Sequence, residues 1–181
     1  MPYDYTDAPP PRDFELIPHG TIATVTVKVR PGNAGEGGIL KRSKDGTCEM
    51  LDLELTVVEG EYARRKFWVY LVLAGTTPGQ QEVANSSRGT LKQILDSACN
   101  LDPNDKSPEA RALRNKDLKD FDGLNFIAKI GVEKGKPKND GSGENWPDKN
   151  IIAAIITPDR REWHPVEQSP PFNGGGNSAA A

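Results

Sequence analysis

The chain has few residues of the types that hold metals or act as nucleophiles. It has two cysteines, Cys48 and Cys99, and two histidines, His19 and His164, among 181 residues. It contains no CxxC pair and no HExxH, GxSxG or GxxxxGK[ST] motif. These absences argue against a zinc site, a hydrolytic triad and a Walker-type phosphate loop. We therefore expect a protein that is not an enzyme and that uses no metal or cofactor.

Long hydrophobic runs are also missing. No apolar run approaches the roughly 20 residues of a membrane-spanning helix, and the opening residues, MPYDYTDAPPP, lack a basic region followed by a hydrophobic one. Only 35% of residues are hydrophobic, and the chain has 18 glycines and 15 prolines. This composition predicts a soluble cytoplasmic protein with a modest core and much loop, of a size that suits one domain.

The chain has no basic surplus, since its net charge is −3, but the acidic residues are unevenly placed. Residues 1–18 contain four carboxylates and only Arg12 as a cation, so residues 19–181 are neutral overall. We expect residues 1–18 to form an acidic, proline-rich arm whose FELIP end docks on the domain. Residues 19–164 are predicted to be that domain, and residues 165–181 a flexible Pro/Gly/Ala tail.

Alternating or continuous apolar residues predict five strands. They cover residues 21–30, 47–58, 64–73, 124–133 and 150–156, and the nearly continuous run NIIAAII predicts a last strand buried on both sides. Between the third and fourth strands, apolar residues at helical spacing predict an amphipathic helix within residues 84–100, with Asn85, Ser86 or Ser87 as the N-cap. A short helix is expected after Ser107, with Pro108 at its first position.

The order strand, strand, strand, helix, strand, strand is that of an OB-fold. We therefore predict a mainly β protein, a five-stranded Greek-key barrel with a helix between strands three and four. Two long glycine-rich loops, residues 31–46 and 134–148, fall between strands one and two and between strands four and five. These are the loops with which an OB-fold grips oligonucleotides, and strands two and three supply the floor.

The stretch RRKFWVYLVL, residues 64–73, has two different faces if it is extended. Phe67 and its alternate neighbours face the core, whereas Lys66, Trp68 and Tyr70 lie in a row on the other face. Flat rings beside a cation form a stacking platform for unpaired bases. Exposed aromatics are more often covered than used, so burial under a helix or a partner chain is the alternative for this strand.

Cations and aromatic residues cluster where the predicted strands meet the loops. We expect phosphates to contact Arg30, Lys41, Arg42, Lys44, Arg64, Arg65 and Lys66, and bases to stack on Trp68, Tyr70 and Trp146. Asp52 and Glu54 alternate onto the outward, solvated face of the second strand. Across a hairpin they could pair with Arg64 or Lys66, which would reduce the charge available to a ligand.

The succession FELIPxG, LDLELTVVEGEYARRKFWVYLVL, LKQILDSA and FDGLNFIAKIGVEKG resembles a family of small phage and prophage proteins, long catalogued as a domain of unknown function. The resemblance covers roughly residues 14–157. It implies an OB-like, sequence-nonspecific single-stranded-DNA-binding protein that acts in phage DNA replication or recombination, in the cytoplasm of the bacterial host. A phage recombinase or nuclease and a second copy of the chain are the partner proteins that we expect.

Two departures from related proteins are visible in the sequence. The segment Leu101 to Lys119 is longer than in many family members, and Pro171-Phe172 lacks the flanking carboxylates of the tails with which cellular single-strand-binding proteins recruit partners. Two alternatives remain open at this level. The aromatic face could serve as a protein-interaction or oligomerisation surface, and RNA could replace DNA.

Overall fold

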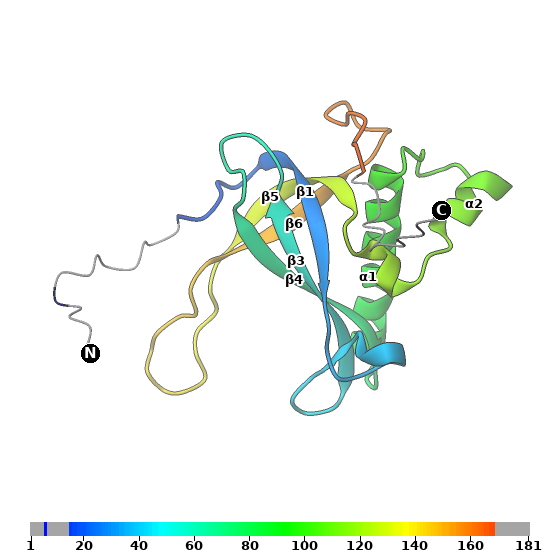
Figure 1. Ribbon diagram of the computed structural model, residues 1–181. Coiled ribbons are helices and arrows are strands. Elements are labelled where there is room, and N and C mark those ends of the chain that lie inside the picture. Colours follow the sequence, from blue (N-terminus) through cyan, green and yellow to red (C-terminus); the bar gives the residue numbers. More distant parts are fainter. Residues whose placement is uncertain (1–5, 7–14, 169–181) are drawn as a thin grey trace, which may run out of the picture.

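The computed structural model describes Thr6 and residues 15–168 (Figure 1). In chain order the elements are β1 (Thr21–Arg30), the 3-10 turn η1 (Glu36–Gly38), β2 (Lys41–Arg42), β3 (Cys48–Val57), β4 (Lys66–Gly75), α1 (Pro78–Ala98), α2 (Pro108–Arg114), the 3-10 turn η2 (Leu118–Phe121), β5 (Asn125–Glu133) and β6 (Lys149–Ile156). All five predicted strands are present, and α1 lies between the third and fourth of them. The short strand β2 falls inside the predicted loop 31–46.

The strands form one antiparallel sheet in which β3 and β1 are central. One side of β3 pairs with β4, and its other side pairs with β1 and, beyond the end of β1, with β2. β1 also pairs with β5, and β5 pairs with β6. The two outer strands, β4 and β6, are therefore separated by the whole width of the sheet in pairing order.

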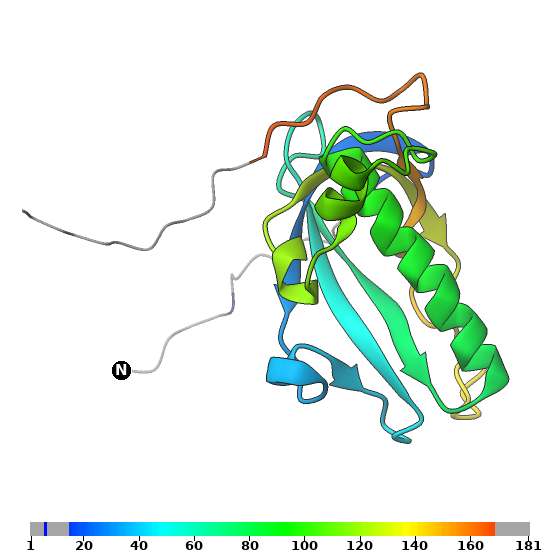
Figure 2. The ribbon, with the colours of Figure 1, turned by 90° about the vertical axis from the view of Figure 1, so that its right-hand side faces the viewer.

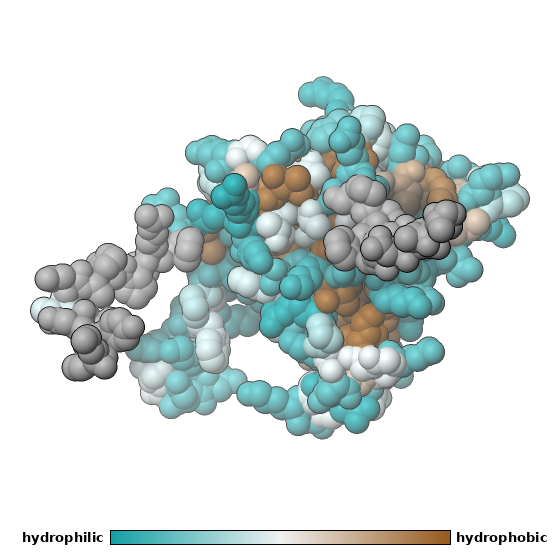
Figure 3. Space-filling view, viewed as in Figure 1, coloured by the Kyte–Doolittle hydropathy of each residue, from teal (hydrophilic) through white to brown (hydrophobic). Residues whose placement is uncertain are grey.

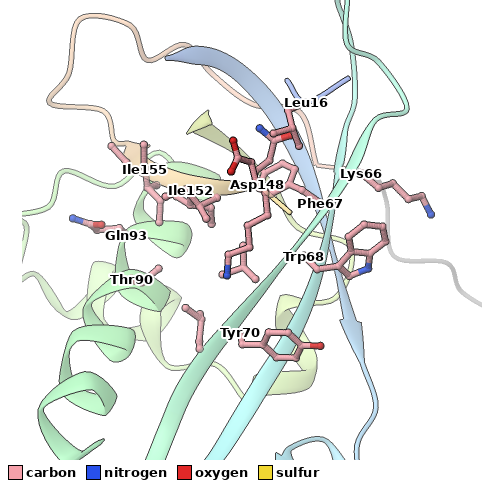
Figure 4. A pocket seen from close by; sticks show the side chains of 17 residues that line it. Leu16, Lys66, Phe67, Trp68, Tyr70, Thr90, Gln93, Asp148, Ile152 and Ile155 are labelled. Atoms are coloured by element: carbon pink, nitrogen blue, oxygen red, sulfur yellow. The ribbon is translucent and has the colours of Figure 1, made fainter. Parts of the chain in front are cut away.

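The prediction of a mainly β, five-stranded barrel is confirmed only in part. The antiparallel strands and the helix between the third and fourth of them are present, but the protein is mixed α/β and its sheet does not close into a barrel. β4 and β6 approach each other but do not pair. Leu16 and the α1 side chains Thr90 and Gln93 line the gap between them (Figure 4). The expectation that the last strand is buried on both sides is also wrong. β6 is an edge strand, and Ala153 at its centre is exposed.

The core lies between the sheet and α1, which crosses one face of the sheet (Figure 2). Alternation along β3 turns Leu51, Leu53 and Leu55 inward, and none of them is exposed. Ile94 and Leu95 of α1 complete the contact. The residues of β3 and α1 that were predicted to face the core are therefore buried, as their spacing indicated.

Helix α1 begins earlier than the sequence analysis predicted. Its N-cap is Thr77, which forms a capping box with Gln80, and Pro78 occupies the first helical position. Asn85, Ser86 and Ser87 therefore lie inside the helix and do not cap it. The prediction for α2 is confirmed, because the Ser107 side chain accepts a hydrogen bond from the Ala110 amide.

Both ends of the described chain are bonded to the sheet. The Ile17 amide donates to Asn150 Oδ1 (3.0 Å), and Asn150 Nδ2 donates to the carbonyls of Ile17 (2.8 Å) and Gly131 (3.1 Å). Ile17 is buried, so the FELIP segment docks as predicted at this residue. At the other end, Gln168 Nε2 donates to the carbonyls of Ala98 and Asn125.

The predicted arm and tail lie mostly outside the described residues, which omit 1–5, 7–14 and 169–181. The chain is still bonded to the domain at residue 168, four residues beyond the predicted domain end at 164. Within the part of the chain that the structure describes, no helix has the length and apolar character needed to cross a membrane.

Candidate functional site

The outward face of β4 carries two large, exposed aromatic rings. Trp68 is 46% exposed and Tyr70 is 53% exposed. Both point away from α1, together with Lys66, whereas Phe67 points to the opposite side of the strand (Figure 4). Coverage by the chain's own helix, one of the alternatives left by the sequence, is thus excluded for these rings.

Strand pairing places these rings in rows with charged side chains. Trp68 lies opposite Glu54 of β3, and Glu54 lies opposite Lys28 of β1. In the next row Tyr70 lies opposite Asp52, which in turn lies opposite Arg30. Each row therefore runs from a cation across a carboxylate to an aromatic ring.

The alternation of the second strand predicted that Asp52 lies on a solvated face. In the structure Asp52 is fully buried. Lys41 forms an ion pair with Asp52 Oδ2, and Arg30 Nη1 lies 3.7 Å from the same oxygen. The Lys41 ammonium also lies 5.7 Å from the centre of the Tyr70 ring. The prediction failed because Lys41 belongs to a strand, β2, that places its side chain beside the carboxylate.

The Asp52 site has one unsatisfied atom. Among the buried side-chain atoms of the described residues, only Asp52 Oδ1 has no hydrogen-bond partner. A buried acceptor without a partner destabilises the folded state. The second oxygen, by contrast, interacts with two cations whose side chains are about a third to two-fifths exposed, Lys41 (32%) and Arg30 (41%). The side chains of Lys41 and Arg30 therefore contact both the Asp52 carboxylate and solvent.

The predicted pairing across the hairpin is confirmed for Glu54. Lys66 Nζ lies 2.6 Å from Glu54 Oε1 and holds the pKa of that carboxyl below its ordinary value. Arg42 is likewise paired with Glu49, at 2.9 Å.

The predicted phosphate-contacting cations differ in their ion pairing. Arg30, Lys41, Arg42 and Lys66 each have a carboxylate partner. Lys44 and Arg64 are exposed and have no carboxylate within ion-pair distance in residues 15–168. Arg65 is half-buried in the turn before β4.

The gap between β4 and β6 is a cavity of about 630 Å³ (Figure 4). A hollow of about 380 Å³ beside Arg64 and Trp68 shares Leu16 and Asn150 with it. A third hollow, of about 510 Å³, is lined by Trp146 and shares Asp148 with the cavity. Concave surface therefore runs along the open edge of the sheet from the start of β4 to the β5–β6 loop.

Trp146 lies in the loop between β5 and β6 and is 61% exposed. Its backbone amide donates to the Lys136 carbonyl (2.8 Å), and the Lys138 ammonium lies 5.6 Å from the centre of its ring. Gly135 allows the two arms of the loop to approach, since a Cβ there would lie 1.5 Å from the Trp146 carbonyl oxygen. The loop thus holds an aromatic ring and a cation together at the surface.

The structure brings the predicted residues together in two sets. Arg64, Arg65, Lys66, Trp68 and Trp146 line the concave surface along the open edge. Arg30, Lys41 and Tyr70 gather around Asp52, and Arg42 and Lys44 lie beyond them at the β2–β3 turn. The two long loops project at the same end of the sheet (Figures 1 and 2), as separate lobes in the space-filling view (Figure 3).

Sequence reasoning missed three residues of this surface. Leu16 and Asn150 line the open edge, and nothing in their local pattern indicated that they would meet. Lys28 is exposed in the Trp68 row, and the alternation of β1 had already placed it on the outward face.

The described residues contain no group of three or more histidine, cysteine, aspartate or glutamate side chains arranged to hold a metal ion. No family model, curated protein or solved structure matches the chain.

Proposed function

We propose that the protein binds single-stranded DNA without catalysis and with little sequence preference. The observation that carries this proposal is the pair of rings, Trp68 and Tyr70, which are about half exposed on a sheet face that also presents cations. Rings of this kind stack on bases of any sequence, and the cations attract phosphates. Trp146 with Lys138, at the far end of the concave surface, provides a further stacking position.

The arrangement of strands supports an OB-fold that is open at one seam. β1 pairs with both β3 and β5, β5 forms a hairpin with β6, and α1 is inserted between β4 and β5. A five-stranded, partly open Greek-key barrel has this connectivity. In such a fold the face of β3 and β4 and the loops 31–46 and 134–148 are the oligonucleotide-binding parts.

The biological setting that we propose rests on the resemblance described above. It is phage-type DNA replication or recombination in the cytoplasm of a bacterial host, with a phage recombinase or nuclease as protein partner.

One observation favours a second candidate, a protein-interaction or self-association surface. Four of the predicted phosphate contacts are already in ion pairs, so the face is less positive than its sequence indicates. Fluorescence titration of labelled oligo-dT at low and high salt, together with gel filtration, distinguishes the two. Salt-sensitive DNA binding by a protein of unchanged size supports the first candidate. Salt-insensitive behaviour with a dimer that depends on Trp68 supports the second.

The variant Lys41→Ala/Arg42→Ala/Lys44→Ala will have a shallower salt dependence of oligo-dT binding. Each cation that neutralises a phosphate contributes about 0.7 to the slope of log Kobs against log salt for single strands. The slope is therefore expected to fall by about 0.7 if Lys44 alone contacts phosphate and by about 2 if all three do. Titration at four or more salt concentrations measures it, and an unchanged slope would show that this loop does not contact DNA.

Asp52→Asn is expected to tighten oligo-dT binding and to steepen its salt dependence. The substitution removes the anion that holds Lys41 and Arg30, and both side chains are exposed enough to turn to a phosphate. The slope should grow by about 0.7 for each cation released. Glu109→Gln, which removes one exposed negative charge on α2, is the matched control. Equal effects of the two substitutions would mean that only net charge matters.

A further inference from the structure

The hollow of about 380 Å³ at the start of β4 has two chemically distinct walls. Trp68 and the cations Arg64 and Arg65 form one wall, and Leu16 and Ile17 of the N-terminal stretch form the other. Its volume lies within the roughly 300–1,000 Å³ range of small-ligand sites. An aromatic ring, an apolar wall and adjacent guanidinium groups together match one nucleotide, which has a flat base and an anionic phosphate.

The N-terminal stretch limits the hollow on one side. Ile17 is fixed there by its two hydrogen bonds with Asn150, and its side chain is buried. On its other side the hollow borders the cavity between β4 and β6, since Lys66 and Trp68 line both. A strand lying along the open edge would therefore reach a wall of main chain at this point, which suits the end of a strand better than a strand passing through.

Three consecutive cations, Arg64, Arg65 and Lys66, line the hollow. Lys66 is paired with Glu54, and among residues 15–168 Glu15 is the one carboxylate that lines the hollow. A terminal phosphate monoester carries about −1.5 to −2 charge near pH 7 and presents three acceptor oxygens. A phosphodiester within a strand carries a single negative charge. Adjacent arginines at a closed end therefore fit a terminal phosphate better than an internal one.

Arg64 has an unfavourable backbone conformation, with φ of 69°. Its amide donates to the Val57 carbonyl (2.8 Å), which fixes the turn, while its side chain is exposed. Gly60, in the same turn, has a similar φ of 84°, but glycine adopts this conformation without steric cost, whereas arginine does not. Strained positions of this kind cluster at binding sites. The turn places the exposed Arg64 side chain at the rim of the hollow, at a position where a glycine would fit the backbone better.

We propose that this hollow binds the terminal nucleotide of a DNA strand that ends in a phosphate, with its base on Trp68 and its phosphate on Arg64 and Arg65. The inference rests on the proposed function and adds to it a recognised strand end.

The test uses short oligo-dT of one length with a 5′-phosphate, a 3′-phosphate or hydroxyls at both ends. We expect one phosphorylated form to bind the full-length protein about tenfold tighter than the hydroxyl form, the effect of about one hydrogen bond to a charged group. The form that responds identifies which end is bound. Equal affinities of all three forms overturn the inference and leave the proposed function in place, whereas failure of every form to bind overturns both.

Arg64→Gly separates binding from folding. It should abolish the preference for a phosphorylated end and, by relieving the strain, raise the thermal midpoint by about 2–4 °C. Asn100→Gly, at the other non-glycine residue with positive φ among those described (φ 56°), is the control for relief of strain and should keep the preference. Arg111→Ala, on α2, controls for loss of one positive charge. An Arg64→Gly protein that retains the end preference contradicts the assignment.

Discussion

Trp68→Ala will weaken binding of oligo-dT by about 5- to 150-fold, which corresponds to about 1–3 kcal/mol, the usual contribution of one stacked base. The ring is nearly half exposed, and Lys66 and Tyr70 lie beside it on the same face of β4. Its loss removes a stacking surface without leaving a hole in the core. Quenching of a labelled oligonucleotide, titrated at fixed salt, measures the change.

The matched control is Leu113→Ala, which truncates a side chain on α2 that is 41% exposed. Both variants should keep the thermal midpoint of the unaltered protein, and only Trp68→Ala should lose affinity for DNA. If Trp68→Ala binds oligo-dT as tightly as the unaltered protein does but no longer self-associates, the aromatic face is an interface between protein chains and the proposed function is wrong.

Asp96→Ala is expected to lower the free energy of unfolding by about 3–5 kcal/mol, because it leaves a buried cation without its partner. Asp96 is fully buried in α1, where its carboxylate accepts from Arg114 Nε (2.7 Å) and Lys92 Nζ (2.7 Å). Arg114 also donates to the carbonyls of Asp105 and Asp102. The cluster therefore joins α1 to α2 and to the segment between them.

Urea unfolding followed by circular dichroism measures this loss. Lys92→Ala is the informative control, because the Lys92 side chain is 43% exposed whereas that of Arg114 is 14% exposed. Lys92→Ala should cost less than Asp96→Ala, because Asp96 keeps its ion pair with Arg114 and no buried cation loses its partner. If Asp96→Ala and Lys92→Ala lower the free energy of unfolding equally, the burial of Asp96 and Arg114 does not explain the loss.

Local pattern was sufficient to predict much of the fold. Period-two alternation identified β1, β3, β4 and β5, because a strand with one face on the core must alternate, and a nearly continuous apolar run identified β6. The same alternation placed Trp68 and Tyr70 on the outward face. The start of α1 was misplaced, because the strong apolar spacing begins only near Leu91, while the actual cap, Thr77, precedes a polar first turn.

The residues by themselves thus determined which segments are strands, which face of each is apolar, and where the rings point. Only the tertiary structure decided that β4 and β6 stay unpaired, that Asn150 holds Ile17, and that Lys41 and Arg30 meet at a buried Asp52. These contacts join residues that are distant in sequence or that depend on the unexpected strand β2. Periodicity describes how one segment presents its faces, whereas closure, burial and charge pairing depend on which segments the sheet brings side by side.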